Sequence, residues 1–376
     1  MAKYRLNDIA PIMQGEVIKA DQYWLLNLDM VESNTGRIID YVYCKENEIG
    51  NSTIKFDTRN VLYSKLRPYL NKVVLPQQSG YATSEMLPLC PNQNIITREY
   101  LTYYLRSQSF VCYINEKTSG AKMPRANSSD LKSYMLNCPS LEDQKSITRQ
   151  LDSIVAIIDK RVKELSKFDE LIKARFVEIF GDPESDNKYP QIAVKDFTDV
   201  VSGGTPDRKN KEYWEEGTVP WVKTTELQNN RIIDVEEKIT EKGLSESSAK
   251  MVPKDTILIA MYGQGKTRGM TAILGIPAST NQACACLLPS ENVIPEYLWQ
   301  FMIMSYDRLR NLAQGGNQPN LNGNMIKDFT VLMPPKEKQM DFVDFVKQVD
   351  KSKSVVQKSL RETKLLFDSL MQKYFG

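Results

Sequence analysis

Residues 139–147, Pro139-Ser140-Leu141-Glu142-Asp143-Gln144-Lys145-Ser146-Ile147, recur in altered form as residues 334–342, Pro334-Pro335-Lys336-Glu337-Lys338-Gln339-Met340-Asp341-Phe342. The two stretches belong to a longer repeat, because residues 119–181 align with residues 314–376 at one constant offset and without a gap. Both copies close on Phe-Gly, at Phe180-Gly181 and Phe375-Gly376. A repeat of this length is too long for a solenoid unit, so it predicts two similar halves and a ligand with two parts.

The first copy of the repeat predicts one long helix over residues 141–180. Apolar side chains recur there at steps of three or four residues, which is the spacing of one helix face. Ser140, followed three positions later by Asp143, favours a helix start, and Gly181 followed by Asp182-Pro183 favours a stop. A helix of this length spans about 60 Å.

The second copy predicts a matching helix over residues 336–375. Its apolar stripe is weaker, because Lys353 and Thr363 stand where the first copy has Ile158 and Phe168. Two amphipathic helices in one chain most simply bury their stripes against each other. We expect an antiparallel, coiled-coil-like pair, since the intervening segment must travel out and return.

The segments before the helices differ from them in amino-acid composition, and they predict mixed α/β globules. Short β-branched or apolar runs predict strands at Val73-Val74-Leu75, at Ile257-Leu258-Ile259-Ala260 and at Cys284-Ala285-Cys286-Leu287-Leu288. Short helices are expected at 97–116 and 295–312. The duplication continues into these segments, since Arg37-Ile38-Ile39-Asp40 recurs as Arg231-Ile232-Ile233-Asp234.

The expected fold class is α+β with a pseudo-two-fold internal repeat. Two mixed α/β domains alternate with two long antiparallel helices. The predicted boundaries are 1–138 for the first globular domain, 139–181 for the first helix, 182–332 for the second globular domain and 333–376 for the second helix. The globules share a scaffold but differ in their loops, as two modules that recognise different sequences would.

Composition narrows the possible functions of the chain. The 376 residues are 41% hydrophobic and 26% charged, and they contain no apolar run long enough for a membrane span, so we expect a cytoplasmic protein without a membrane partner. The chain has no histidine, and its six cysteines form no CxxC pair, so we expect no metal site and no catalytic residues. The net charge of +2 supplies no large basic excess for phosphate neutralisation. Binding to DNA would therefore depend on local patches or on a partner.

The stretch Ala260-Met261-Tyr262-Gly263-Gln264-Gly265-Lys266-Thr267 permits two interpretations. Its Gly-Lys-Thr end fits a phosphate-binding loop, although Ala260 replaces the first glycine of that motif. Alternatively, a strand leads into a polar loop whose side chains suit base edges and phosphates, or simply into a solvated turn.

Other polar loops offer the same kind of side chain at equivalent places in both halves. Arg and Lys can pair with guanine, and Asn and Gln with adenine. The candidate DNA-binding residues are Lys65, Arg67, Tyr69, Lys72, Lys122, Arg125, Thr205, Arg208, Lys223, Thr224, Gln264, Lys266, Thr267, Arg268, Asn281, Gln282, Asn317 and Gln318.

With this layout, the chain resembles the specificity subunit of a type I restriction-modification system. The resemblance rests on Pro139 to Ile147 leading to Phe176 to Gly181, and on the second copies at 334–342 and 371–376. It also rests on Ser202-Gly203-Gly204-Thr205-Pro206, Tyr213-Trp214 and Val219-Pro220-Trp221, which are similar to the start of a target-recognition domain in that family. The first half departs from this pattern, because it has Met13-Gln14-Gly15-Glu16 in place of Gly-Gly-Thr-Pro.

The resemblance implies that each globule is a target-recognition domain for one half of a split, double-stranded DNA target. The helix pair would set the unread spacer. It would also dock two methyltransferase subunits, which carry AdoMet, and ATP- and Mg-dependent restriction subunits with translocase activity would join them. This chain would hold no cofactor. Glu142, Gln144, Glu337 and Gln339 are the candidate partner-binding residues.

Two other functions remain open from the sequence. The chain could be an assembly scaffold for two protein partners that does not contact DNA. It could also be a nucleotide-dependent enzyme built on the loop Gly265-Lys266-Thr267.

Overall fold

The computed structural model describes residues 2–120, 122–182, 188–263, 265–313 and 320–376. The chain divides into two compact units. Unit 1 comprises Met1–Lys163 with Gln357–Gly376, and unit 2 comprises Glu164–Val356. Each unit therefore combines one globular part with sections of both long helices, α5 (Leu141–Phe180) and α10 (Lys336–Phe375). None of the described helices combines the length and the apolar composition that a bilayer span needs.

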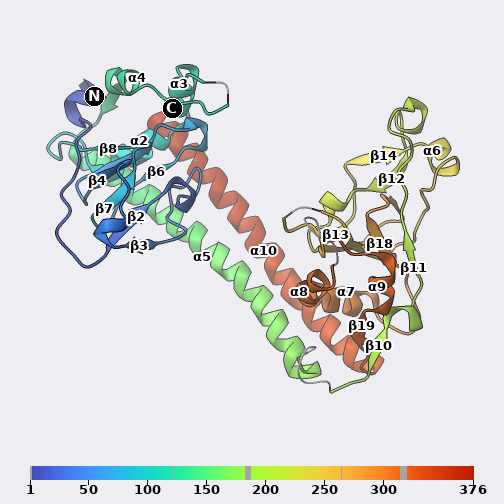
Figure 1. Cartoon of the computed structure of the whole chain (residues 1–376). Coiled ribbons are helices and arrows are strands. Elements are labelled where there is room, and N and C mark those ends of the chain that lie inside the picture. The colour runs from blue at the N-terminus through green and yellow to red at the C-terminus, as the bar shows by residue number, and fades with distance from the viewer. Residues whose placement is uncertain (1, 121, 183–187, 264, 314–319) are drawn as a thin grey trace. The chain divides into compact units, whose positions relative to one another are not determined.

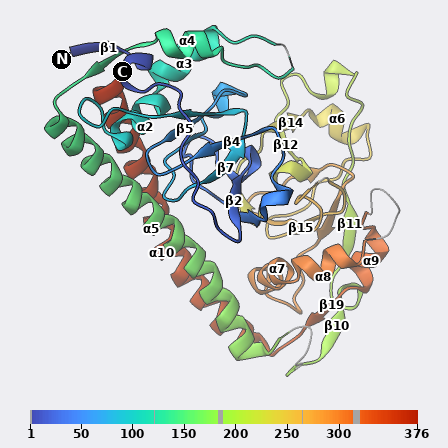
Figure 2. The same ribbon diagram turned by 60° about the vertical axis from the view of Figure 1, so that its left-hand side comes forward.

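The described residues of unit 1 form three small sheets. β1 (Ala2–Arg5) pairs antiparallel with β9 (Met135–Cys138). The four-stranded sheet has the order β3 (Val42–Cys44), β2 (Tyr23–Leu26), β7 (Gly80–Thr83), β4 (Thr53–Phe56), and the three-stranded sheet has the order β6 (Val73–Val74), β5 (Val61–Ser64), β8 (Met86–Leu89). Only the β2–β7 pair is parallel among these strands. The helices are α1 (Leu6–Ile9), α2 (Arg98–Arg106), α3 (Gln108–Glu116) and α4 (Ser128–Ser133), and α2 packs on β5 and β6 (Figure 2).

Unit 2 repeats this plan with additional strands. β10 (Gln191–Ala193) pairs antiparallel with β19 (Thr330–Leu332). The five-stranded sheet has the order β11 (Val200–Ser202), β18 (Cys284–Leu287), β15 (Ile257–Ala260), β16 (Thr271–Leu274), β13 (Asn230–Ile232). The third sheet has the order β14 (Glu237–Ile239), β12 (Val219–Val222), β17 (Ser279–Thr280). The helices are α6 (Glu241–Ser245), α7 (Pro295–Met304), α8 (Tyr306–Asn311) and α9 (Gly323–Asp328) (Figure 1). Helix α7 packs on β15 and β16.

The two units share their connectivity as well as their repeated sequence. In each, the first strand pairs with the strand that directly precedes a long helix. The parallel pair β2–β7 of unit 1 has its counterpart in β12–β17 of unit 2. The antiparallel pairs β5–β8 and β15–β18 also correspond. The mixed α/β content and the internal repeat expected from the sequence are therefore confirmed.

Both long helices are confirmed at the predicted positions. Ser140 caps α5, because its Oγ accepts a hydrogen bond from the Asp143 amide at 3.1 Å and donates one to the Asp143 carboxylate at 2.7 Å. At the other end Gly181 has φ +85°, a left-handed conformation that glycine adopts without steric cost, so the helix stops there. The expected shorter helices are also present, each broken once at a serine, Ser107 or Ser305.

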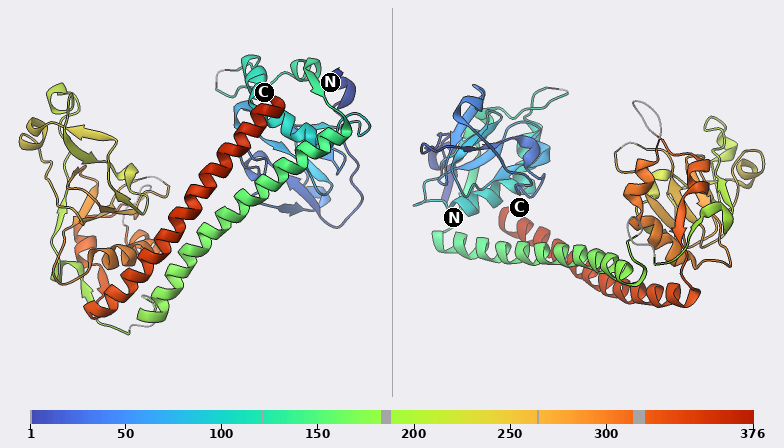
Figure 3. Two further views of the ribbon diagram at one scale, coloured as in Figure 1. Left: turned by 180° about the vertical axis from the view of Figure 1, so that it is seen from behind. Right: turned by 60° about the horizontal axis from the view of Figure 1, so that its bottom comes forward.

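In each unit the end of one long helix packs beside the start of the other. In unit 1 the last turns of α10 share an apolar core with Ile147 and Leu151 of α5 (Figure 3). In unit 2 the Phe176 ring of α5 lies 5.4 Å from the Phe342 ring of α10. The helix sections within each unit are therefore antiparallel. Lys353, which interrupts the apolar stripe of α10, forms an ion pair with Asp169 of α5 at 2.7 Å.

Candidate nucleic-acid interface

Two predicted contact loops of unit 1 lie side by side. The Arg67 amide donates to the Pro124 carbonyl at 2.8 Å, and the Ala126 amide donates to the Lys65 carbonyl at 2.8 Å. These backbone hydrogen bonds join residues 65–67, directly after β5, to residues 124–126, which follow α3 in the chain. Residues from two distant stretches of the sequence therefore form one polar surface.

The charges on this surface are only partly available to a ligand. Glu85 pairs with Arg125 at 3.2 Å and with Lys65 at 4.0 Å, so two candidate cations are balanced within the chain. Arg67 and Lys122 are exposed and form no ion pair with the side chains that the structure describes. Tyr69 is 51% exposed, as a ring that stacks on a base or packs on a sugar would be.

Lys72 has a structural environment that the sequence did not indicate. Its Nζ donates to the Leu28 carbonyl at 2.6 Å, and partial burial lowers the pKa of this amine. The side chain therefore fastens the residue before β6 to Leu28. The DNA contact expected of Lys72 therefore stays a prediction, made for a half-buried side chain that already donates a hydrogen bond within unit 1.

In unit 2 the Gly-Gly-Thr-Pro segment joins the turn that precedes β18. A Cβ atom on Gly203 would lie 2.2 Å from the Thr280 carbonyl oxygen, so only glycine permits this approach. The Thr205 hydroxyl then donates to the Gln282 carboxamide oxygen, while the Asn281 amide donates to the Val222 carbonyl at 3.0 Å. The structure thus brings together Thr205, Asn281 and Gln282.

The tryptophans of the second half support the same segment. The Trp221 indole N–H donates to the Gly204 carbonyl at 2.9 Å, and the Trp214 indole N–H donates to the Asp207 carbonyl at 3.0 Å. The Arg208 guanidinium lies 3.7 Å from the centre of the Trp214 ring. Sequence reasoning quoted these tryptophans as part of a motif but did not assign them this supporting role.

Arg208 and Lys223 meet at a common carboxylate. Glu237 forms ion pairs with Arg208 and, at 2.9 Å, with Lys223, whose Nζ also contacts Glu236 at 2.7 Å. Burial opposes ionisation of Glu237, but hydrogen bonds from Lys223 and Arg208 outweigh it, so the pKa of Glu237 lies below its usual value. Thr224 follows directly, half-buried, at the start of a short 3-10 helix (Thr224–Glu226). These two cations are placed together but are balanced within unit 2.

The loop with Gly265-Lys266-Thr267 connects two antiparallel strands, β15 and β16. A phosphate-binding loop leads into a helix whose N-terminus faces the phosphates, whereas this loop leads into a strand. The Tyr306 hydroxyl donates to the Lys266 carbonyl at 2.7 Å, and Arg310 donates to the carbonyls of Gly265 and Arg268, both at 2.9 Å. The loop therefore lacks the helix that a phosphate-binding loop needs, and hydrogen bonds from Tyr306 and Arg310 hold it against α8 instead.

That loop presents an exposed Lys266 with Thr267 and Arg268 half-buried beside it. It lies near the Asn281-Gln282 turn, because the Met261 amide donates to the Ala283 carbonyl at 2.8 Å. Three further candidates, Gln264, Asn317 and Gln318, lie outside the described residues.

The candidate partner residues fall into two classes. Glu142 and Glu337 are exposed in the first turns of α5 and α10. Gln144 and Gln339 are each 0% exposed, which corrects the expectation that they face a partner. Gln144 accepts from the Thr97 amide at 2.9 Å and donates to the carbonyls of Ile95 and Pro139 at 2.8 and 3.0 Å.

Gln339 has the same position in unit 2. It accepts from the Ile294 amide at 2.9 Å and donates to the Pro334 carbonyl at 2.8 Å. Each glutamine therefore joins the start of a long helix to the segment before α2 or α7. Their identity at the repeat offset was the signal in the sequence that could have revealed this role.

A second pair of anchors lies at the other helix ends. The Phe375 ring of α10 lies 5.1 Å from the Tyr100 ring of α2, and the Phe180 ring of α5 lies 5.2 Å from the Tyr297 ring of α7. Each globular part thus holds the start of one long helix through a glutamine and the end of the other through a phenylalanine. The two sets of polar loops are carried on equivalent supports.

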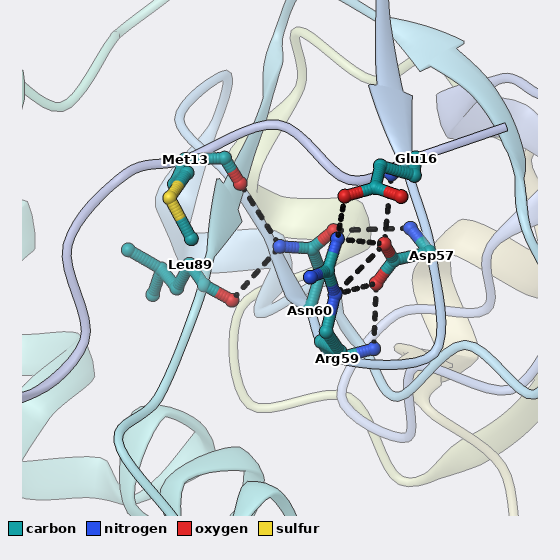
Figure 4. Close-up of polar contacts among 6 residues, drawn as sticks. All are labelled: Met13, Glu16, Asp57, Arg59, Asn60 and Leu89. Carbon is teal, nitrogen blue, oxygen red and sulfur yellow. Dashed lines mark hydrogen bonds and ion pairs between the residues drawn. The ribbon is translucent and has the colours of Figure 1, made fainter.

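Unit 1 fastens its segment Met13–Glu16 by a charged cluster that the sequence did not indicate (Figure 4). Asp57 accepts from the Glu16 amide at 2.7 Å and pairs with Arg59 at 2.7 Å, and the Asn60 carboxamide donates to the Met13 carbonyl at 3.0 Å. Burial alone would raise the pKa of Asp57, but hydrogen bonds from Arg59 and the Glu16 amide lower it to about 2. This cluster holds the segment of unit 1 that stands in place of the Gly-Gly-Thr-Pro segment of unit 2.

Comparison with known proteins identifies relatives of both halves. A family model described as the type I restriction modification DNA specificity domain matches residues 1–167 and 187–363. The MjaIX specificity subunit of Methanocaldococcus jannaschii is 32% identical over 178 residues, which cover 44% of this chain and 40% of that protein. The EcoR124I/EcoR124II specificity subunit of Escherichia coli is 24% identical over 230 residues, 58% of this chain and 56% of that protein. The chain thus spans about half the length of these two relatives.

Solved structures share the fold. A chain from a structure of complex assembly and conformational transition in the type I R-M system matches with a TM-score of 0.63 at 16% identity, covering 100% of this chain and 97% of that chain. The type I restriction-modification S subunit from M. genitalium matches with a TM-score of 0.55 at 15% identity, covering 100% of this chain and 96% of that chain.

Proposed function

The chain belongs to the family defined by the type I restriction modification DNA specificity domain, and from this premise we propose that it specifies the DNA target of a type I restriction-modification complex. Residues 1–138 and 182–332 would each contact one half of a bipartite, double-stranded target. The two helical segments, 139–181 and 333–376, would form the spacer between them. The chain would perform no catalysis of its own.

The observation that carries this proposal is the repeated support beneath different loops. Gln144 and Gln339 make the same kind of contact, as do Phe375 and Phe180. The loops above these anchors use different side chains, such as Arg67 and Tyr69 in unit 1 against Thr205 and Gln282 in unit 2. A constant support with variable polar loops suits recognition of two different half-sites.

The spacer part of the proposal follows from helix length. A helix of 40 residues is about 60 Å long, which exceeds one turn of B-DNA at about 34 Å. Continued pairing of α5 and α10 from one unit into the other would hold the two recognition parts on successive major grooves.

We propose that methyltransferase subunits dock on the apolar side chains that the long helices leave exposed. In unit 1 these include Leu365 at 68% and Ile157 at 46% exposure, and in unit 2 they include Val355 at 70% and Leu171 at 46%. Exposed apolar residues on both helices in both units suit a partner present in two copies. AdoMet, ATP and Mg would belong to the methyltransferase and restriction subunits.

Substitution of one residue in a single loop tests whether that loop contacts one half of the DNA target. Lys266→Ala, made in the full chain and assembled with its methyltransferase partners, should relax or weaken recognition of one half-site and leave the other unchanged. Lys211→Ala is a matched control, because Lys211 is also exposed but pairs with Glu215, four positions later, at 3.3 Å. Sequencing of methylated bases measures both half-sites at once.

The scaffold alternative predicts a different outcome. A scaffold would leave the methylated motif unchanged in the Lys266→Ala and Arg67→Ala variants alike. Its assembled complex would bind duplex DNA no better than the partners alone. Either result would contradict the proposed role in target recognition.

A further inference from the structure

Unit 1 contains a cavity of about 870 Å³ between its globular part and the long helices. Its walls come from residues 34–38, from the junction of α2 and α3, from the middle of α5 and from the last turns of α10. Cavities of roughly 300–1,000 Å³ are typical of sites for small molecules. None of the residues proposed to contact DNA lines this cavity.

Arg106, the last residue of α2, borders this cavity. The residue is half-buried and belongs to the cavity wall, and its guanidinium lies deep in the unit. It donates to the Val73 carbonyl and forms no ion pair with a described side chain. Burial lowers the pKa of Arg106 to about 10, and the nearby Tyr103 and Asp152 offset the effect of burial only in part.

A buried cation without an acidic partner costs free energy, and an anion placed beside it recovers that cost. Charges at the rim do not supply this anion. Arg37 is paired with Asp159, while Lys364 and Asp368 lie together on α10 and bring no net charge. The cavity therefore retains one cation, that of Arg106, that a negatively charged ligand would neutralise.

The remaining wall is largely apolar. Val74 and Leu75 line it from β6 and the residue after it, Ile158 from α5, and Phe367 and Met371 from α10. An inorganic anion would contact Arg106 but leave these side chains facing water. An anion with an apolar body would use both parts of the cavity.

The corresponding place in unit 2 has different chemistry. At the repeat offset Lys353 replaces Ile158, Asp350 replaces Val155, and Asp169 replaces Lys364. Lys353 and Asp169 pair with each other across the helices at 2.7 Å. The combination of an apolar wall and an unpaired arginine is thus specific to unit 1 and not a consequence of the shared fold.

We propose that the cavity of unit 1 binds a small organic anion, whose acidic group contacts Arg106 and whose apolar body lies against Phe367 and Met371. Because the walls belong to the globular part and to both helices, the ligand would fasten these elements together. Binding to the folded form alone would also raise the thermal stability of the chain.

The probe for this test is 8-anilinonaphthalene-1-sulfonate, which carries one sulfonate on an aromatic body and fluoresces when shielded from water. Fluorescence titration of the full chain should give one saturable site per chain. Arg106→Gln should weaken binding by roughly 10- to 100-fold, because it removes a charged hydrogen bond to the sulfonate. Arg67→Gln, a change of the same type on an exposed arginine outside the cavity, should leave the affinity unchanged.

A second variant keeps the test decisive if Arg106→Gln does not fold. Gln108 is exposed at the rim of the cavity, so Gln108→Glu adds a negative charge without disturbing the core. It should weaken probe binding several-fold at low salt and less at high salt. Inorganic phosphate should displace the probe only at far higher concentration than the probe itself.

Three results would overturn the proposal. The first is the absence of saturable binding to the wild-type chain. The second is an affinity for the probe that equals the wild-type value in Gln108→Glu and, if it folds, in Arg106→Gln. The probe would then bind elsewhere. The third is phosphate that competes as well as the probe, since the apolar wall would then contribute nothing.

Discussion

Units 1 and 2 hold the long helices by equivalent contacts but shape their polar loops by unrelated ones. Gln144 and Gln339 bond to backbone groups ahead of α2 and α7, and Phe375 and Phe180 pack on Tyr100 and Tyr297. The loops differ, because unit 1 fastens its entering segment with Asp57 and Arg59, whereas unit 2 uses glycines and tryptophans. The duplication has therefore kept the contacts that hold the long helices, whereas each unit shapes its polar loops with different residues.

The largest expected effect comes from the phenylalanine anchors. Phe180→Ala and Phe375→Ala should each lower the free energy of unfolding by about 3–5 kcal/mol, because each removes a buried ring. Urea unfolding followed by tryptophan fluorescence should place the loss in unit 2 for Phe180, through Trp221, and in unit 1 for Phe375, through Trp24. Leu365→Ala is the control, since this exposed residue should change stability by less than about 0.5 kcal/mol. If the losses in the free energy of unfolding were no larger than that of the control, the two rings would not stabilise the helix ends.

The glutamine anchors should give the next largest effect. Gln144→Ala and Gln339→Ala should each cost about 1–3 kcal/mol, because backbone groups buried beside them lose their hydrogen bonds. Chemical denaturation of Glu142→Ala and Glu337→Ala provides matched controls, since these neighbours are exposed. If the glutamines were partner contacts instead, their substitution would weaken complex assembly and leave the stability of the free chain unchanged.

The acid sensitivity of unit 1 should depend on Asp57. Its folded-state pKa of about 2 lies below the unfolded value, so the ion pair contributes stability above about pH 4 and loses it as the pH falls toward 2. The contribution amounts to about 2 kcal/mol at neutral pH. Asp57→Asn should therefore flatten the stability profile of unit 1 between pH 4 and 2, measured through Trp24. An unchanged profile would show that the cluster does not hold Met13–Glu16 in place.

The smallest effect is expected where the repeat exchanges an apolar residue for a charge. Lys353→Ile restores the residue type found at Ile158 and removes an ion pair that is largely exposed on its Asp169 side. Because such pairs contribute at most about 1 kcal/mol, thermal unfolding should shift little. A large destabilisation would mean that the two helix sections are packed differently in the two units.

The sequence predicted those parts of the fold that depend on local pattern. Apolar periodicity predicted both long helices, Ser140 and Gly181 predicted the limits of α5, and short β-branched or apolar runs predicted β15 and β18. These features follow from residues within a few positions of one another. The repeat itself gave the two-part plan.

The candidate site was less predictable, because partners far apart in the sequence decide what a polar side chain does. Gln144 is buried only because residues 95–97 lie against the start of α5, and Lys223 is neutralised by Glu236 and Glu237. Asp57 meets the Glu16 amide across 41 positions. Residue type and spacing do not reveal such contacts, so the sequence did not indicate that Gln144 and Gln339 are buried.

Exchange of residues 182–332 for the corresponding segment of another family member tests the central claim most directly. The methylated bases in cells that carry the chimaera, with its partner subunits, should define a motif with one half changed and with the other half and the spacer length unchanged. A motif changed in both halves, or in neither, would contradict the assignment of one half-site to each recognition part.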